Sequence, residues 1–120
     1  MEGHRQGFQQ DIVSAEIGQA LGHPIRLEIL RLLAQGERCS CQIEPLFRVD
    51  QSGVSRHLAA LRRAGLIVSR QDGVRALHRL ASPRVARLVR ELNALADERT
   101  GAARRALGRG SLRKIGGGKT

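Results

Sequence analysis

The stretch QSGVSRHLAALRRAGLIVSRQDGVRALHRL, residues 51–80, decides the fold. Its first half places Val54, Leu58 and Leu61 at i, i+4 and i+7, on one face of a predicted helix. Gly65 then provides a typical helix C-terminus. Its second half reads as two short strands joined by a tight turn at an Asp-Gly pair. The stretch therefore predicts a helix followed directly by a β-hairpin.

Further helices are predicted before this stretch. Apolar residues at helical spacing predict one helix over 8–21, and a second begins at Pro24 and is stopped by Gly36. A short or irregular third helix is expected over 40–47, because a proline falls within it. Asp50 is a good N-cap for the helix of the opening stretch. Helix, turn, helix and hairpin in this order form a winged helix-turn-helix.

The chain continues into one more helix and a basic tail. The hairpin is expected to turn at Asp72-Gly73, and the last helix begins at Ser82 and Pro83. Apolar residues in the last helix follow the 3-4-3 spacing of a helix-pairing seam, and the first helix carries a stripe suited to the same role. The residues expected at a dimer interface are Ile12, Ile17, Val85, Leu88, Leu92 and Leu95.

The predicted fold class is thus mainly α with a small β-hairpin, as a dimeric winged helix-turn-helix. Residues 1–107 are expected to form one DNA-binding and dimerisation domain. Residues 108–120 are expected to form a flexible, basic, glycine-rich tail. Length agrees with a single domain, because 120 residues suffice for one modest core.

Composition narrows the class of protein. The net charge of +10 and the pI near 11.6 point to a polyanion, usually nucleic acid. There is no apolar run of about 18 residues and no signal-peptide pattern, so no membrane span and a cytoplasmic location are expected. A bridge between Cys39 and Cys41 would close a very small ring, so both thiols are expected to be free in a reducing compartment.

The predicted helix after Asp50 and the hairpin supply the candidate contacts with double-stranded DNA. Side chains at the helix start face away from the apolar stripe, where glutamine can pair with adenine and arginine with guanine. Arginines at the helix end suit phosphates, and the hairpin tip suits a minor groove or flanking phosphates. The alternative is an ordinary solvated surface, and His57 is expected to be packed. The candidate contacts are Gln51, Ser52, Ser55, Arg56, Arg62, Arg63, Arg70, Gln71 and Arg75.

Residues 21–80 resemble the ArsR/SmtB family of bacterial metal-sensing repressors. The family pattern L-x-x-P-x-R-L-x-I-L-x-x-L is matched from Leu21 to Leu33, E-x-C-x-C by Glu37, Cys39 and Cys41, and S-x-V-S-x-H-L-x-x-L-x-x-A-G-L from Ser52 to Leu66. The resemblance implies a homodimer built on its first and last helices. It also implies that the protein binds operator DNA without effector and releases it when a metal or metalloid binds.

Within this resemblance, Cys39 and Cys41 correspond to the sensing site of the arsenic- and cadmium-responsive branch. Thiolates are the ligands that thiophilic ions prefer. Residues at i and i+2 point the same way in extended backbone but diverge by about 200° on a helix, so one ion can be chelated only where the backbone is not helical. Binding is then expected to distort the helix start just before the DNA-reading helix and to favour a conformer with poor DNA fit.

The effector is expected to be As(III) or Sb(III), with Cd(II), Pb(II), Zn(II) or Hg(II) as alternatives and no organic cofactor. The arsenic-sensing pattern often has a third cysteine where this chain has Glu44, so Glu44 and His4 are the remaining candidate ligands. The last helix has no histidine for the family's zinc and nickel site. Thiol oxidation near Arg38 is a rival sensing chemistry. A constitutive architectural DNA binder is a further alternative, whereas no pattern of catalytic residues indicates an enzyme.

Overall fold

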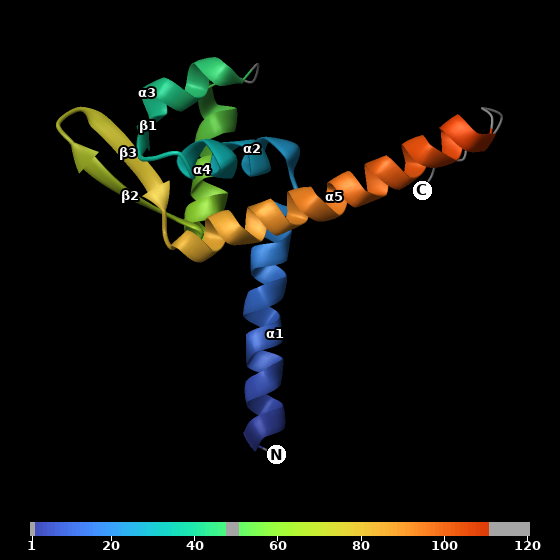
Figure 1. Cartoon of the computed structure of the whole chain (residues 1–120). Coiled ribbons are helices and arrows are strands. Elements are labelled where there is room, and N and C mark those ends of the chain that lie inside the picture. The colour runs from blue at the N-terminus through green and yellow to red at the C-terminus, as the bar shows by residue number, and fades with distance from the viewer. Residues whose placement is uncertain (1, 48–50, 111–120) are drawn as a thin grey trace. The chain divides into compact units, whose positions relative to one another are not determined.

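The computed structural model (Figure 1) describes residues 2–47 and 51–110. The chain divides into two compact units, Met1–Ala86 and Arg87–Thr120. Within the described residues, no helix is both long and apolar enough to cross a membrane.

The helices of the first unit follow the predicted order. The Nδ1 atom of His23 accepts a hydrogen bond of 3.1 Å from the backbone N–H of Ile25, which caps the second helix one residue before Pro24. Gly65 adopts a φ of +78° just after the fourth helix, a conformation that favours glycine over other residues. The elements are α1 (Glu2–Leu21), α2 (Pro24–Leu33), α3 (Ser40–Ile43), the 3-10 turn η1 (Glu44–Leu46), α4 (Gln51–Arg63) and the first residues of α5 (Pro83–Gly110).

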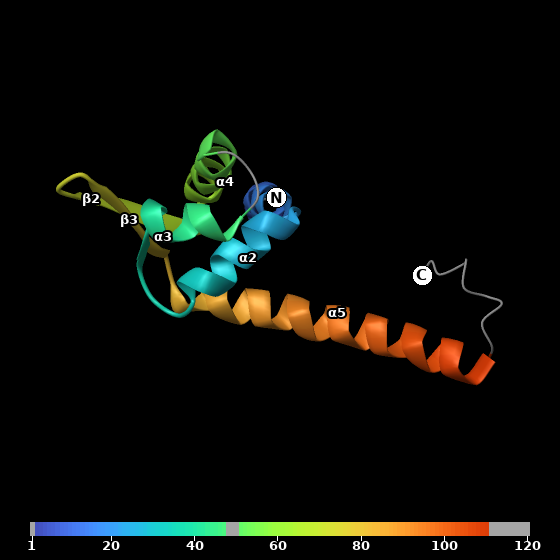
Figure 2. The ribbon, with the colours of Figure 1, turned by 90° about the horizontal axis from the view of Figure 1, so that it is seen from above.

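The hairpin gains a third strand that was not predicted. Strands β2 (Ile67–Asp72) and β3 (Arg75–Leu80) pair antiparallel, and β1 (Arg38–Cys39) pairs antiparallel with the other edge of β3. The hairpin projects from the helices of the first unit in both views (Figures 1 and 2). Two residues are too few to show the alternation of apolar and polar side chains that predicts a strand. Strand β1 is therefore recognised only from its pairing with β3 in the structure.

The hairpin turn lies one residue later than expected. Asp72 pairs with Arg75, so the loop consists of Gly73 and Val74 and not of Asp72 and Gly73. Gly73 has a φ of +65°, which places the glycine at the first loop position. The expected turn at Asp72-Gly73 is therefore wrong by one residue, because Asp72 still belongs to β2.

The core is aliphatic, as the composition requires. Val54, Leu58 and Leu61 are at most 3% exposed, which confirms the predicted inner face of α4. They are buried together with residues of α2, α3 and the sheet. The other side chains with less than 2% exposure are Ile29, Leu30, Cys39, Ile43 and Ile67.

Several predicted boundaries differ from the structure. The first helix begins at Glu2 and not at residue 8, because the polar start of α1 has no apolar stripe to reveal it. The third helix is short and continues as a 3-10 turn, as predicted from its proline. Helix α5 reaches Gly110, three residues into the segment predicted as tail. Asp50, the expected N-cap of α4, lies outside the described residues.

The residues expected at a dimer interface differ in exposure. In the first unit, Ile12 is 44% exposed and Ile17 is half-buried, whereas Val85 is 6% exposed and has almost no surface left for a partner. The second unit contains the rest of α5. There Leu88 and Leu95 are 40% and 63% exposed, and Leu92 is half-buried. The neighbouring Val89, which was not predicted, is 3% exposed.

Candidate functional site

Helix α4 presents two unlike faces. Ser55 and Arg56 are exposed, on the side away from the buried stripe. Gln51 and Ser52 belong to the first turn of the same helix. Arg62 and Arg63 are exposed in its last turn. The described side chains thus lie where the sequence placed them, and their contacts with DNA stay predictions.

Two arginines of the hairpin already have acidic partners. The guanidinium of Arg70 makes two hydrogen bonds to the Glu37 carboxylate, from Nε to Oε2 at 3.1 Å and from Nη2 to Oε1 at 3.0 Å. The bond from Arg70 holds the pKa of the Glu37 carboxyl below its usual value. Arg75 pairs with Asp72 at 3.5 Å across the turn. Gln71 is exposed, and its amide donates to the Gly73 carbonyl at 3.4 Å.

The Arg70 pair was not foreseen, because nothing in sequence spacing relates residues 33 positions apart. It joins the hairpin to the segment that leads into Cys39. Arg70 remains 57% exposed, so the pair is solvated and contributes little to stability.

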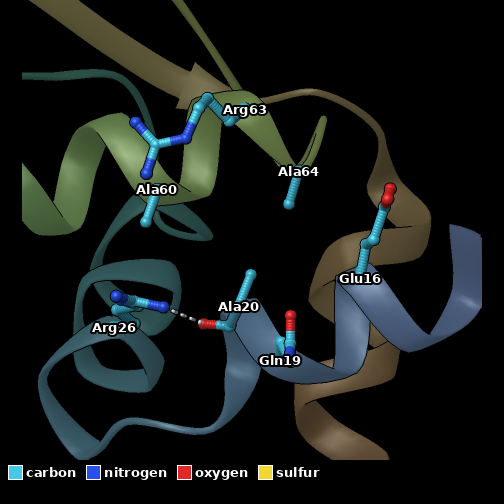
Figure 3. A pocket seen from close by; sticks show the side chains of 7 residues that line it. All are labelled: Glu16, Gln19, Ala20, Arg26, Ala60, Arg63 and Ala64. Carbon is cyan, nitrogen blue, oxygen red and sulfur yellow. Dashed lines mark hydrogen bonds between the residues drawn. The ribbon is translucent and has the colours of Figure 1, made fainter.

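A shallow groove of about 370 Å³ lies between α1, α2 and α4 (Figure 3). Arg26 crosses it: Nη1 donates to the Ala20 carbonyl at 3.4 Å, and Nε donates to Nδ1 of His57 at 3.1 Å. This arginine therefore ties α2 both to the end of α1 and to α4. The residues that line the groove are Glu16, Gln19, Ala20, Arg26, Ala60, Arg63 and Ala64.

His57 is packed, as its position near the inner flank of α4 predicted. Its ring lies 4.3 Å from that of His23, centroid to centroid. Burial, and then the positive charges of His23, Arg26 and Arg56, lower the pKa of His57. Because Nδ1 accepts from Arg26, protonation of the ring would place two donors against each other.

Acidification is expected to weaken the folded state through His57. Its pKa in the folded chain lies below the ordinary 6.5, so the stabilisation is complete above that value and is lost as the pH falls through the lower, folded-state pKa. We expect the free energy of unfolding, measured with urea, to drop as the pH is lowered below the ordinary histidine pKa of 6.5. His57→Gln keeps an acceptor for Arg26 but takes up no proton, and should drop less.

His78 is expected to add to the loss of stability at low pH. Burial, and then the charge of Arg62, lower the pKa of His78 as well. A residual fall in stability is therefore expected in the His57→Gln variant. Equal falls in the wild type and the variant would contradict the role given to His57.

The two cysteines meet at a change of backbone conformation. Cys39 ends β1 with an extended backbone (φ −85°, ψ 161°), and Cys41 lies in α3. Their sulfur atoms are joined as a disulfide, with the Cα atoms 5.1 Å apart. The expectation of two free thiols is therefore wrong for this structure. The reason is local: extended backbone at Cys39 removes the divergence that two helical residues at this spacing would show.

The surroundings of the pair are asymmetric. Cys39 is fully buried and Cys41 is exposed. The backbone N–H of Cys39 donates to the side-chain Oε1 of Gln42 at 2.9 Å, which fixes the start of α3. No described residues form a group of three or more His, Cys, Asp or Glu side chains able to hold a metal ion. Glu44, in η1, therefore completes no such group, and His4 lies in α1, outside the side chains that the structure describes.

A buried histidine lies beside the cysteines. His78 is 3% exposed, and both of its ring nitrogens are hydrogen-bonded: Nε2 and Ser40 Oγ are 2.9 Å apart, and Nδ1 and Ser69 Oγ are 2.7 Å apart. A short serine–histidine–serine arrangement across three elements leaves no signal in sequence spacing.

Comparison with known proteins decides the family. The sequence model described as "Bacterial regulatory protein, arsR family" matches residues 23–69. A probable mercury resistance operon repressor of Streptomyces lividans is 34% identical, over 74% of this chain and 71% of that protein. The chain belongs to the ArsR family. The relatives that it matches are HTH-type transcriptional regulators and repressors.

Two further comparisons concern the fold and the share of each relative that this chain covers. The winged helix-turn-helix DNA-binding domain of a possible ArsR-family regulator from Mycobacterium bovis, homodimeric in solution, is 38% identical and superposes with a TM-score of 0.70, covering 78% of this chain and 86% of that one. An HTH-type regulator of Mycobacterium tuberculosis is 40% identical over 70% of this chain, and the match spans 37% of that protein. This ArsR-family chain thus has the winged helix-turn-helix fold, with α4 in the position of the recognition helix and β2–β3 in the position of the wing.

Proposed function

We propose that the chain is a homodimeric repressor that leaves its operator when a thiophilic metal or metalloid binds Cys39 and Cys41. The observation that carries the proposal is that both sulfurs meet at the junction of β1 and α3. As(III) and Sb(III) are the favoured effectors, and Cd(II), Pb(II), Zn(II) and Hg(II) are alternatives. All of these ions accept sulfur ligands. The relative from Streptomyces, a probable repressor of mercury resistance, agrees with this chemistry.

The donor set fits an ion that accepts two sulfurs. A bound ion would supply a bridge between the reduced thiolates, and further ligands would come from solvent or from the second subunit. The chain itself contributes the buried sulfur of Cys39, on a strand that is paired with β3 of the wing. Glu44 and His4 remain proposals as additional ligands.

A second copy of the chain is the proposed partner for α1 and α5. Helix α1 leaves Phe8 64%, Ile12 44% and Val13 53% exposed, and helix α5 leaves Leu95 63% exposed. Single exposed apolar residues are ordinary, but several on one helix mark a surface that is covered in the working protein. A dimer would also present two copies of α4 to DNA, as two half-sites require.

The chain connects the cysteines to the DNA-reading elements by short paths. Strand β1 pairs with β3 of the wing, Arg38 with His78 and Cys39 with Leu77. A change of backbone at residues 39–41 must therefore pull on the wing. An ion that binds the two conformers with different affinity shifts their populations and lowers DNA affinity by the same coupling.

The test is operator binding by fluorescence anisotropy, with the reduced protein and each ion added in turn. We expect As(III) or another thiophilic ion to weaken DNA binding of the wild type by about tenfold or more, a typical coupling. The double variant Cys39→Ser, Cys41→Ser should bind DNA normally and ignore the ion. Glu44→Gln is the matched control at the candidate third ligand. Release of the double variant by the same ion would place the sensing site elsewhere.

Redox sensing by the same two thiols is the second candidate, because the structure joins their sulfurs. Oxidation would then remove two electrons and two protons from the thiol pair, with a peroxide as acceptor. Metal-free protein distinguishes the two functions. Peroxide should release DNA only under redox sensing, and a thiol reductant should restore binding. A constitutive DNA binder would ignore both the ions and the peroxide.

A further inference from the structure

The residue between the two cysteines has a partner of its own. Ser40 follows Cys39 and precedes Cys41, so it lies inside the ring that their disulfide closes. Its hydroxyl contacts Nε2 of His78 on β3 at 2.9 Å. Whatever joins or separates the two sulfurs resets the backbone that carries Ser40. The hydroxyl of Ser40 is therefore placed to report the state of the cysteine pair.

His78 is buried and needs a hydrogen-bond partner at each ring nitrogen. It is 3% exposed, and both of its ring nitrogens are used. In a neutral imidazole one nitrogen donates and the other accepts, so each bond needs a hydroxyl in the matching role. If Ser40 moves away, a buried nitrogen loses its partner, which is unfavourable unless the ring or its strand moves too. Movement of Ser40 is therefore expected to move the His78 ring or its strand as well.

The other side of His78 leads to the DNA-reading elements. Ser69 lies directly opposite His78 in the β2–β3 ladder, and its Oγ is 2.7 Å from Nδ1. A longer contact of 3.5 Å runs from Nη1 of Arg62, in the last turn of α4, to the same hydroxyl. Ser69 is thus part of the wing, and its side chain also contacts Arg62 of α4.

We propose that Ser40, His78 and Ser69 form a relay that carries the state of the Cys39–Cys41 pair to the wing and to α4. This inference rests on the proposed function, since it explains how an ion at the cysteines alters DNA binding. His78 acts as a positioning residue. The relay is buried at its centre, in contrast to the solvated Arg70–Glu37 pair, which water and salt screen.

The experiment compares effector binding with effector response in Ser40→Ala and Ser69→Ala. Cd(II) serves as the probe, because its thiolate bonds give an ultraviolet charge-transfer band that reports binding directly. Each variant should keep this band, while Cd(II) weakens its DNA binding less than threefold relative to the same variant without metal, against tenfold or more in the wild type. Ser40→Thr, which keeps the hydroxyl, should restore the response. Glu37→Gln, which breaks the exposed pair, should respond like the wild type.

A spectroscopic readout separates a relay from a merely structural role. The ¹⁵N resonances of the His78 ring should shift when Cd(II) binds the wild type, and should stay in place in Ser40→Ala. If neither Cd(II) nor As(III) nor another thiophilic ion releases the wild type, the proposed function fails and the relay fails with it. If As(III) but not Cd(II) releases the wild type, the same comparison of variants is made with As(III). If the wild type is released, and Ser40→Ala and Ser69→Ala bind Cd(II) and are released equally, the relay alone is wrong.

Discussion

Leu61→Ala is expected to destabilise the protein by about 2–5 kcal/mol, the usual cost of emptying a leucine site in a packed core. Leu61 has no exposed surface and lies on the inner face of the recognition helix. Its loss removes apolar burial and leaves a cavity among aliphatic neighbours that relax only in part. The measurement is the urea midpoint and slope, followed by circular dichroism.

Leu46→Ala is the matched control, because Leu46 is 60% exposed in η1. The same change of side chain should there cost less than about 1 kcal/mol, as surface substitutions usually do. Similar losses in both variants would mean that Leu61 is not the buried anchor of α4.

Arg56→Ala is expected to cost about 1–3 kcal/mol in the discrimination between operator and random DNA. Arg56 is exposed on the outer face of α4, where an arginine fork can bond both acceptors of a guanine. Affinity for the operator should fall about ten- to hundredfold, while affinity for random DNA changes little. The measurement is anisotropy with both duplexes at several salt concentrations.

Arg63→Ala is the control on the same helix. Arg63 lies at the rim of the groove beside α1 and is expected to meet phosphates, so its loss should weaken both duplexes alike and lower the salt slope. If Arg56→Ala behaves in the same uniform way, Arg56 is a phosphate contact and α4 reads bases through other residues.

Periodicity predicted the parts of the fold in which one face is buried over many residues. The inner face of α4 and the end of that helix at Gly65 followed from apolar spacing and from glycine chemistry alone. The sequence could not reveal β1, because two residues carry no period. It also misplaced the hairpin turn by one residue, since Asp72 and Gly73 are both good turn residues and only strand pairing separates them.

The candidate site divides in the same way. The outward direction of Arg56 follows from helix geometry, and the role of the cysteines from a family resemblance. The partners of Arg70 and His78 do not follow from either. Glu37 and Arg70, like Ser40 and His78, meet only because β1 adds to the wing, so a prediction that lacks β1 loses both contacts.

The brevity of β1 has a consequence for how the molecule fluctuates. Strands β2 and β3 each contain six residues, whereas β1 contributes two to the same sheet. An edge held by so few pairings opens more readily than the ladder beside it, and its amide hydrogens should exchange with solvent sooner. The cysteine segment can therefore detach from β3 and pair with it again while the hairpin stays folded. Local opening at the cysteines is then faster than unfolding of the whole protein.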